Sequence, residues 1–320
     1  AHGGRSPAGV ERFRSAPRLT RLRAMRIVTN PGSNLDEDTT LAKDIDLTPQ
    51  KIVVDGISHD TRNTIDFAQV DGWVKRAIKH PQVQGTTEQD FVEYFTRLVK
   101  KDPEVLCVMT SRKLIGSHDA AIAAVAKLKQ SPDPEVKAAR IEVVDSTITD
   151  VGAGLVTLAA VQARKAGLSL KDTATFLRAF AERGRNVVTV ATLDNLIKGG
   201  RASFLQGWVG NFLNIRPIIS IIDGATSSVS KMSGKADIVQ KMDEYLSSRI
   251  DPKTPVWLGV THGNVPDKAK AVADRLQERY RCEYVLVRPL SPSIYLHIGP
   301  GGVGAFILPL DGLSFRPSPP

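Results

Sequence analysis

The chain has 320 residues, a length that suits two domains better than one small core, and its 42% hydrophobic and 24% charged residues are ordinary for a soluble globular protein. No run of about 18 apolar residues occurs, so no membrane span is predicted. The two cysteines, Cys107 and Cys282, form no CxxC or metal-ligand spacing. We interpret them as reduced core residues of a cytoplasmic protein.

The formal net charge of +9 is unevenly distributed along the chain. Residues 1–24 contain six arginines and one glutamate, which leaves +4 for the other 296 residues. That body has no Lys/Arg stripe with interleaved aromatic residues, so nucleic-acid binding is not favoured. Residues 1–24 also lack the apolar core of a secretory signal. They could be a transit peptide, but we favour a disordered or non-native extension before Met25.

From residue 25 onward, short apolar runs alternate with amphipathic stretches, which is typical of a parallel α/β sheet. We assign this part, residues 25–167, to a first domain. A capping box formed by Thr86 and Gln89 is predicted to start its clearest helix. The patterns predict strands at 25–30, 48–54, 105–110 and 141–145, and helices at 35–43, 70–79, 86–100, 120–129 and 152–165.

A second α/β domain is predicted at 168–312, followed by a disordered tail at 313–320. Within it, residues 193–213 look helical but carry four glycines. The patterns predict strands at 186–190, 215–222, 256–261, 284–287 and 303–308, and helices at 170–183, 238–247 and 266–280.

The segment 295–304 is the most informative stretch of the sequence. His297 stands just before a glycine cluster that includes Gly299 and Gly301. Glycines let several backbone N–H groups point at one spot, and a histidine adds a donor that can be neutral or charged near pH 7. Two interpretations stay open: a small pocket for a carboxylate or phosphate, or a tight turn between two buried strands with His297 in the core.

Three loops of the first domain lie directly after a predicted strand or directly before a predicted helix, at 29–34, 85–87 and 110–118. In an open α/β sheet, ligands bind outside the carboxyl ends of the strands, and a helix N-terminus there favours an anion. Hydroxyl groups at Thr86 and Ser117 suit such a site, although helix capping alone explains both of them.

In the second domain, Arg201 follows the pair Gly199-Gly200, so a guanidinium and bare backbone could bind one carboxylate or phosphate together. The alternative is a solvated helix end. No GxSxG elbow, HExxH, Cys/His cluster, GxxxxGK[ST] loop or GxGxxG after the first strand is present. The sequence therefore indicates no catalytic triad, metal, cofactor or nucleotide site.

The motifs together resemble the DegV family of bacterial fatty-acid-binding proteins, in order and over roughly residues 25–310. The match at 27–35 has Asn30 in place of the family's aspartate. The matching segments are 27–35 (TDSxxDL in the family), 110–121 (SSxLSGTxxSA), 193–203 (LxxLxxGGRIS), 212–219 (LLNIKPIL) and 297–304 (HTGPGALG).

The resemblance implies a two-domain α/β protein, with a parallel-sheet domain, a second mixed-sheet domain and one long-chain fatty acid buried between them. The carboxylate would lie near the domain junction, close to Arg201 and His297, which match the family's GGR and HxGPG motifs. Such proteins perform no chemistry themselves. In many bacteria they present the fatty acid to a separate kinase subunit, which makes acyl phosphate for phospholipid synthesis.

This chain departs from the family pattern at two head-group loops. The family's SGT becomes Ile115-Gly116-Ser117, and its TSQPS loop aligns to 83–87, where the leading threonine is missing. The basic segment before the late helix, at 231–235, is also thinner. Because a buried carboxylate costs several kcal/mol unless donors meet it, we expect these ligand-binding residues: Asn30, Thr86, Thr87, Ser117, Arg201, His297, Gly299 and Gly301.

Two other functions stay open. The HxGPG loop and Arg201 could handle a phosphorylated substrate directly, as in a phosphotransferase or hydrolase. Alternatively, the chain could be a lipid carrier that has no kinase partner, which the altered head-group loops would suit.

Overall fold

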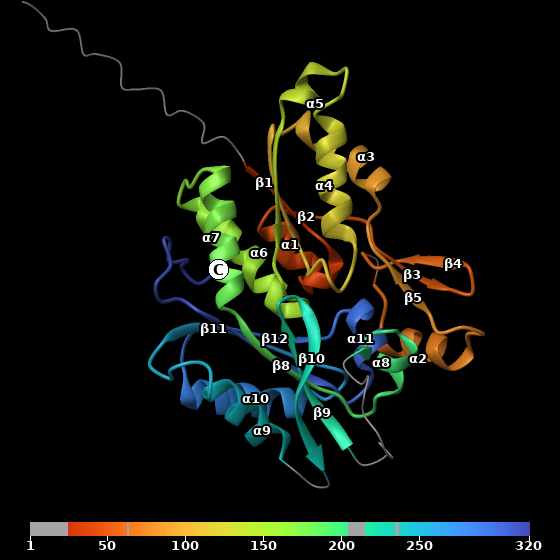
Figure 1. The fold of residues 1–320 in the computed structure, drawn as a ribbon, viewed down its shortest axis with the longest axis vertical. Coiled ribbons are helices and arrows are strands. Elements are labelled where there is room, and N and C mark those ends of the chain that lie inside the picture. Colours follow the sequence, from red (N-terminus) through yellow and green to blue (C-terminus); the bar gives the residue numbers. More distant parts are fainter. Residues whose placement is uncertain (1–24, 63, 204–214, 234–236) are drawn as a thin grey trace, which may run out of the picture.

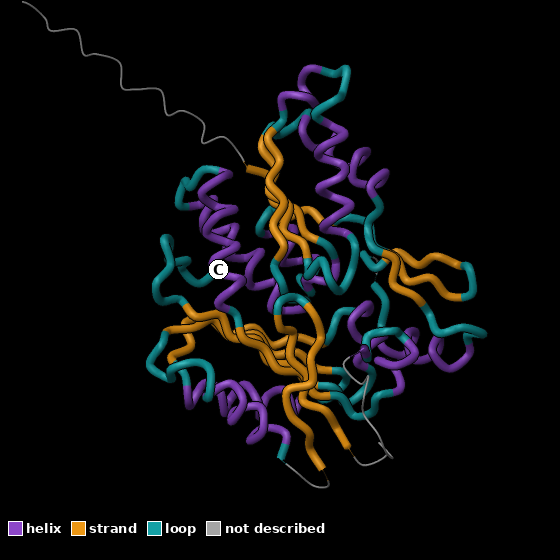
Figure 2. The backbone as a smooth tube through the Cα atoms, viewed as in Figure 1, coloured by secondary structure: helices purple, strands orange, loops and turns teal. Residues whose placement is uncertain are grey.

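The computed structural model describes residues 25–62, 64–203, 215–233 and 237–320 of the chain (Figure 1). Two large sheets dominate it, with helices both between the sheets and on their outer faces (Figure 2). One sheet is parallel and the other is mixed, which confirms the predicted two-domain α/β class. The predicted extension at 1–24 lies outside the described residues.

The first sheet has four parallel strands, in the spatial order β2 (Ile45–Leu47), β1 (Met25–Thr29), β6 (Glu104–Met109) and β7 (Arg140–Asp145). Strand β6 is buried along its whole length because helices cover both faces of the sheet. One face is covered by α3 (Glu88–Val99) and α4 (Ser117–Leu128), with α5 (Pro134–Ala138) beside them. A short 3₁₀ helix, η1 (Pro31–Ser33), and a short α-helix, α1 (Glu37–Ala42), join β1 to β2.

The second sheet has six strands, in the order β10 (Ala225–Ser233), β9 (Ile215–Ile222), β8 (Arg185–Thr189), β13 (Val303–Pro309), β11 (Pro255–His262) and β12 (Arg281–Pro289). Only β11 and β12 run parallel to each other. Its outer face is covered by α9 (Ile238–Ser247) and α10 (Pro266–Arg279). No helix in the described ranges is long and apolar enough to cross a membrane.

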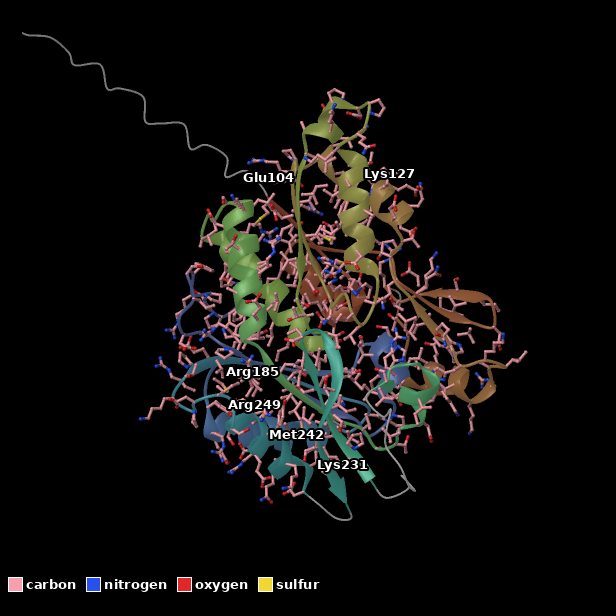
Figure 3. The ribbon with its side chains drawn as sticks, viewed as in Figure 1. Glu104, Lys127, Arg185, Lys231, Met242 and Arg249 are labelled. Atoms are coloured by element: carbon pink, nitrogen blue, oxygen red, sulfur yellow. The ribbon has the colours of Figure 1, made fainter. Side chains whose placement is uncertain are left out.

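Helices α6 (Asp150–Lys165) and α7 (Leu170–Arg183) pack between the two sheets. Helix α6 contacts β1 and β6 of the first sheet and β11 and β13 of the second, and its first fourteen residues are buried. Side chains fill the space between the sheets (Figure 3), where Trp257 and Leu308 join the core of the first sheet. The predicted domain boundary at 167 falls in the turn between these two shared helices and stays a prediction.

A small antiparallel sheet extends from the side of the first unit and corrects one prediction. It consists of β4 (Ile57–Asp60), β3 (Lys51–Val54) and β5 (Gln82–Gln84), and α2 (Phe67–Arg76) follows its hairpin. The strand predicted at 48–54 is present as β3, but it begins three residues later, at Lys51, and the separate strand β2 was not predicted. Strand β2 ends at Leu47 and β3 begins at Lys51 in a different sheet, because Pro49 lies between them and cannot donate to a ladder.

The predicted capping box is displaced by one residue. Thr87, and not Thr86, caps α3: its hydroxyl accepts from the N–H of Asp90, whose carboxylate accepts from the N–H of Thr87. Within the helical-looking stretch at 193–213, the structure has the short helix α8 (Asp194–Lys198). Residues 204–214 lie outside the described residues.

Six strands and α-helices were not predicted, namely β2, β4, β5, α5, β10 and α11. The tail is better packed than expected. Strand β10 follows the turn at 223–224, and α11 (Pro292–Ile298) occupies part of the stretch interpreted as a loop or turn. In place of a disordered tail, Phe315 packs edge-on against Phe176 with ring centroids 5.1 Å apart. Burial of this aromatic ring outweighs the disorder that the proline-rich composition indicated.

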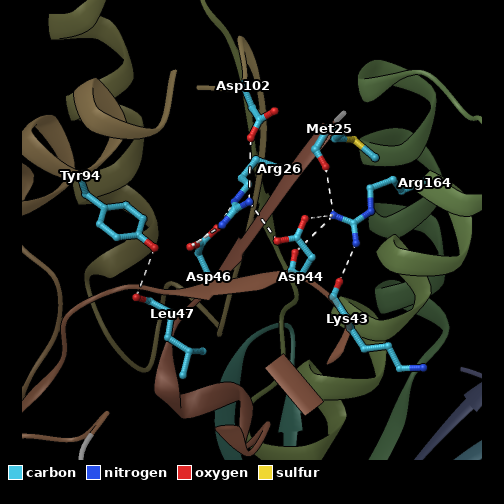
Figure 4. A network of polar contacts seen from close by, with 9 residues as sticks. All are labelled: Met25, Arg26, Lys43, Asp44, Asp46, Leu47, Tyr94, Asp102 and Arg164. Carbon is cyan, nitrogen blue, oxygen red and sulfur yellow. Dashed lines mark hydrogen bonds and ion pairs between the residues drawn. The ribbon is translucent and has the colours of Figure 1, made fainter. Parts of the chain in front are cut away.

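Ion pairs tie the far edge of the first sheet to α6 (Figure 4). Arg26 on β1 donates to Asp46 on β2 and pairs with Asp44 at 2.9 Å. Arg164, near the end of α6, donates to the backbone carbonyl of Lys43 at 2.6 Å. The hydrogen bond to Asp46 raises the pKa of Arg26, so this group keeps its charge at any physiological pH. Helix α6 is therefore anchored by charge at one end and by packing along its length.

We predict that Gly154→Ala lowers the free energy of unfolding by about 1–3 kcal/mol, because an added Cβ would lie 2.5 Å from the backbone oxygen of Ser33. Gly72→Ala in α2 is the matched control. Its Cβ meets only the flexible end of Arg76, and we expect a gain of up to about 1 kcal/mol. Urea unfolding of both variants measures the two effects. Equal stability changes would contradict the close packing of α6.

Candidate functional site

A cavity lies between the two units, at the N-terminal end of α6. It encloses about 850 Å³ with its open mouth included. Its wall combines an apolar majority with a few polar groups, as in sites for amphipathic ligands. The first unit contributes Asn30, Gly32, Gln50, Val83, Thr110, Leu114, Ile115, Thr149 and Asp150; the second contributes Val188, Leu196, Arg201, Ile219, Ile221, Thr226, Thr261, Leu290, Ser293, Ile294, His297, Ile298 and Phe306.

His297 lines this cavity from the last turn of α11, a helix that begins with Pro292 in its first turn. The side chain is only 8% exposed, and its Nδ1 has no hydrogen-bond partner. Burial, with the nearby charges of Arg201 and His80, lowers its pKa to about 3. The imidazole is therefore neutral at physiological pH and can serve as a hydrogen-bonding group without adding charge.

Gly199 allows this close packing around His297. A Cβ at residue 199 would lie 2.4 Å from the imidazole Nδ1, so only glycine lets the end of α8 approach the ring. The predicted pair of glycines before Arg201 thus has a packing role in the structure. It brings α8 against α11 and places the guanidinium that follows at the cavity wall.

Arg201 is a half-buried cation that connects the two units. Its guanidinium donates to the carbonyl of Gly199 at 2.9 Å and to the carbonyl of Leu114, in the first unit, at 3.1 Å. Burial lowers its pKa, yet an arginine stays charged in proteins. Among the described residues no carboxylate pairs with it. The cavity wall therefore carries a guanidinium to which no carboxylate of the described residues is bonded.

Asn30 lines the cavity, but its side-chain amide already makes hydrogen bonds within the protein. The Nδ2 group donates to the hydroxyl of Thr110 at 3.0 Å and to Gln50 at 3.3 Å, and Oδ1 accepts from the N–H of Thr110. These contacts join the ends of β1 and β6. Asn30 thus lies at the cavity wall, its hydrogen bonds hold the loops together, and its role in ligand binding stays a prediction.

Thr86, Thr87 and Ser117 do not line the cavity. The Ser117 hydroxyl accepts from the N–H of Thr86 at 3.1 Å, and the Thr86 hydroxyl donates to the carbonyl of Pro49. Ser117 is not the N-cap of α4 either, because Gly116 occupies that position and Ser117 is the first residue of the helix. These hydroxyls therefore bind neighbouring loops to one another.

Gly299 and Gly301 also lie outside the cavity wall. Their backbone N–H groups donate within the protein, to the carbonyls of Tyr295 and Gly263, both at 2.7 Å. Neither N–H is left for an anion, so the glycine cluster forms a turn. That turn connects α11 to β13, whereas the sequence suggested a turn between two strands.

Sequence reasoning missed Asp150, the first residue of α6. It is 1% exposed, lines the cavity and has a left-handed φ of 56°. Neither carboxylate oxygen makes a well-formed hydrogen bond, although the Thr261 hydroxyl and the Asn34 amide lie close by. Burial raises its pKa to about 7. One signal was available: an acid directly before a helix made almost entirely of small and apolar residues.

We predict that His297 contributes to acid unfolding. Because its folded pKa of about 3 lies below the unfolded value of 6.5, its contribution to stability is present above pH 6.5 and is lost as the pH falls toward 3. Asp150 acts in the opposite sense: its raised pKa gives stability that is present below pH 3.8 and is lost as the pH rises through about 7.

The comparison of wild type with His297→Gln isolates the histidine, since both proteins keep Asp150. Below pH 6.5 we expect the wild type to lose stability relative to the variant by up to about 1.4 kcal/mol per pH unit. Urea unfolding between pH 7 and pH 4 measures this difference. Two parallel stability curves would show that the folded imidazole is not held neutral.

Comparison with known proteins places the chain in a family. Residues 24–310 match the family model described as uncharacterised protein, DegV family. A DegV domain-containing protein of Mycobacterium tuberculosis is 29% identical over 284 residues, which cover 88% of this chain and 96% of that protein. A DegV domain-containing protein of Clostridium acetobutylicum is 25% identical over 281 residues, with the same coverage of both chains.

Solved structures share the fold. A DegV family protein from Thermus thermophilus, described by its fatty acid binding, aligns with a TM-score of 0.80 and 21% identity over 89% of this chain and 99% of that one. DegV from Bacillus subtilis, described as a fatty acid binding protein, aligns with a TM-score of 0.76 and 21% identity over 89% and 98% of the two chains. The family model covers nearly all of the described chain, and the chain therefore belongs to the DegV family.

Proposed function

We propose that the chain binds one long-chain fatty acid in the cavity between its two units, with the carboxylate at His297 and Arg201 near the junction. The single observation that carries this proposal is the guanidinium of Arg201 in the wall of a largely apolar cavity, where it bonds two carbonyls but no carboxylate of the described residues. Related structures support the ligand class: besides the two above, a DegV family protein from Eubacterium eligens is described as loaded with heptadecanoic acid.

The energetics favour an amphipathic ligand of this kind. Each methylene that leaves water contributes about 0.8 kcal/mol, so roughly ten methylenes supply about 8 kcal/mol. A buried carboxylate costs several kcal/mol unless a cation or donors meet it. Arg201 supplies the cation, and the neutral imidazole of His297 supplies a donor without adding a second charge.

The hydroxyl groups of the family pattern are replaced in this chain by apolar side chains at the wall. Val83 stands where the family's TSQPS loop has its threonine, and Ile115 stands where its SGT has its serine; both line the cavity. Head-group binding in this chain therefore depends more on the guanidinium and the imidazole than on hydroxyls.

We predict that Arg201→Gln weakens fatty acid binding by about 10- to 100-fold, because a hydrogen bond to a charged group contributes about 1.5–3 kcal/mol. Displacement of a fluorescent fatty acid from delipidated protein measures the change. Arg249→Gln is the control: Arg249 follows α9 (Figure 3), stacks on the ring of Tyr245 at 3.7 Å and does not line this cavity. Lipid-free purified protein that binds no fatty acid would overturn the proposal.

We also propose that the bound fatty acid is presented to a separate kinase subunit and that this chain performs no phosphoryl transfer itself. This part rests on the family resemblance. We expect acyl phosphate from fatty acid and ATP only when a bacterial fatty acid kinase subunit is added, measured by mass spectrometry. Acyl phosphate formed by the chain alone would indicate an enzyme. Lipid binding without any product in the presence of the kinase would indicate a carrier that has no such partner.

A further inference from the structure

The cavity contains a second polar centre that the proposed carboxylate contacts do not use. Asp150 at the start of α6 and Thr261 on β11 both line the wall, and both are almost fully buried, at 1% exposure. Neither oxygen of the Asp150 carboxylate makes a well-formed hydrogen bond, and neither does the hydroxyl of Thr261, although the two groups lie close together. Three polar atoms at one part of the wall therefore lack a well-formed hydrogen bond.

Unsatisfied buried polar groups are costly, so their presence at a cavity wall points to an occupant. A buried group without a partner loses roughly 1–3 kcal/mol, and a charged group loses more. Valine has almost the shape of threonine, and an apolar residue in place of Asp150 would remove the cost. The polar pair is understandable when a ligand atom completes its hydrogen bonds.

The surroundings of Asp150 limit what that ligand atom is. The donors close to its carboxylate are the hydroxyl of Thr261, the amide of Asn34 and the N–H groups of Val151 and Ser291. No basic side chain is among these neighbours, and among the described residues Asp150 is the one acid in the cavity wall. Among the described residues no group of three or more acids, histidines or cysteines could hold a metal ion. A small neutral group that both donates and accepts fits this position.

We propose that the cavity binds acyl chains bearing a hydroxyl group, and that Asp150 and Thr261 hold this hydroxyl. This inference rests on the proposed function and narrows its ligand class. The ligand hydroxyl donates to the Asp150 carboxyl and accepts from the hydroxyl of Thr261. The carboxyl has two oxygens and accepts in either protonation state, so the bond is kept on both sides of neutral pH.

A purely structural role for Asp150 is the competing explanation. In that case the residue tethers the start of α6 to β11 and to the entry of α11 through its nearby donors. The two explanations differ in one measurable respect. A tether affects the stability of the protein, whereas a hydroxyl site discriminates between ligands that differ by one oxygen atom.

The test uses the delipidated full chain and matched ligands. Hexadecanoic acid is compared with hexadecanoic acids that carry one hydroxyl at carbon 3, 8, 10, 12 or 16, by displacement of a fluorescent fatty acid. We expect at least one positional isomer to bind about tenfold or more tightly than the unsubstituted acid. Sites built to hydrogen-bond a ligand hydroxyl discriminate strongly against analogues that lack it.

Two isosteric variants assign the preference. Thr261→Val removes the unpaired hydroxyl at the cavity wall and should reduce the preference for the hydroxylated isomer at least threefold. Thr173→Val is the matched control: it removes another fully buried, unpaired threonine hydroxyl, on α7 and away from the cavity, and should leave the preference unchanged. Asparagine tolerates the left-handed φ at residue 150, and in Asp150→Asn we expect part of the preference for the hydroxylated acid to persist.

The outcomes separate this inference from the proposed function. If hexadecanoic acid binds and no hydroxylated isomer binds more tightly, the hydroxyl site is overturned while fatty acid binding stands. A preference that survives unchanged in Thr261→Val also overturns the site as described. If the chain binds neither class of acid, both proposals are overturned.

Discussion

The burial of α6 on both sides is the constraint on which the rest of the structure depends. A helix that packs against two sheets at once needs small residues where a neighbour comes closest, and Gly152 and Gly154 occupy those positions against Phe306 and Ser33. Because the same helix belongs to the cores of both sheets, separating the two units would expose apolar surface along its whole length. The helix thereby fixes the walls of the cavity that opens at its N-terminal end.

Burial also sets the electrostatics of that cavity, with opposite effects on two titratable groups. Desolvation disfavours the charged form of any group, so the pKa of His297 is lowered to about 3 while the pKa of Asp150 is raised to about 7. Arg201 alone stays charged under all physiological conditions. At a pH below about 7, where Asp150 is protonated, the site carries one positive charge, and a single carboxylate neutralises it. An apolar chain with one acidic end matches both the charge and the surface of the wall.

Much of the fold was predictable because apolar periodicity directly reflects burial. Strand β6 and helix α7 lie where their patterns placed them. The failures have local causes. Pro49 cannot donate to a ladder, so the strand predicted from residue 48 begins only at Lys51, and α11 has only seven residues, too few for a periodic signal. Of the predicted site residues, Asn30, Arg201 and His297 reach the cavity wall, while the hydroxyls of Thr86 and Ser117 are used between loops.

The glycine cluster shows why residue type alone cannot assign a binding role. A glycine whose backbone N–H group is free for a ligand looks the same in the sequence as a glycine whose N–H group is hydrogen-bonded within a turn. Only the hydrogen-bond partner of the N–H group distinguishes these two cases. Here the N–H groups of Gly299 and Gly301 are hydrogen-bonded within the protein, and the neighbouring Gly263 closes the turn by donating to the carbonyl of Gly302. The effect of the turn on the site is indirect: it ends α11 directly after His297, which keeps the imidazole at the wall. The same reasoning explains why Asp150 escaped notice, since an acid at the start of a helix is ordinarily a favourable first-turn residue. Its significance lies in what surrounds it, namely complete burial and donors that stop short of bonding it.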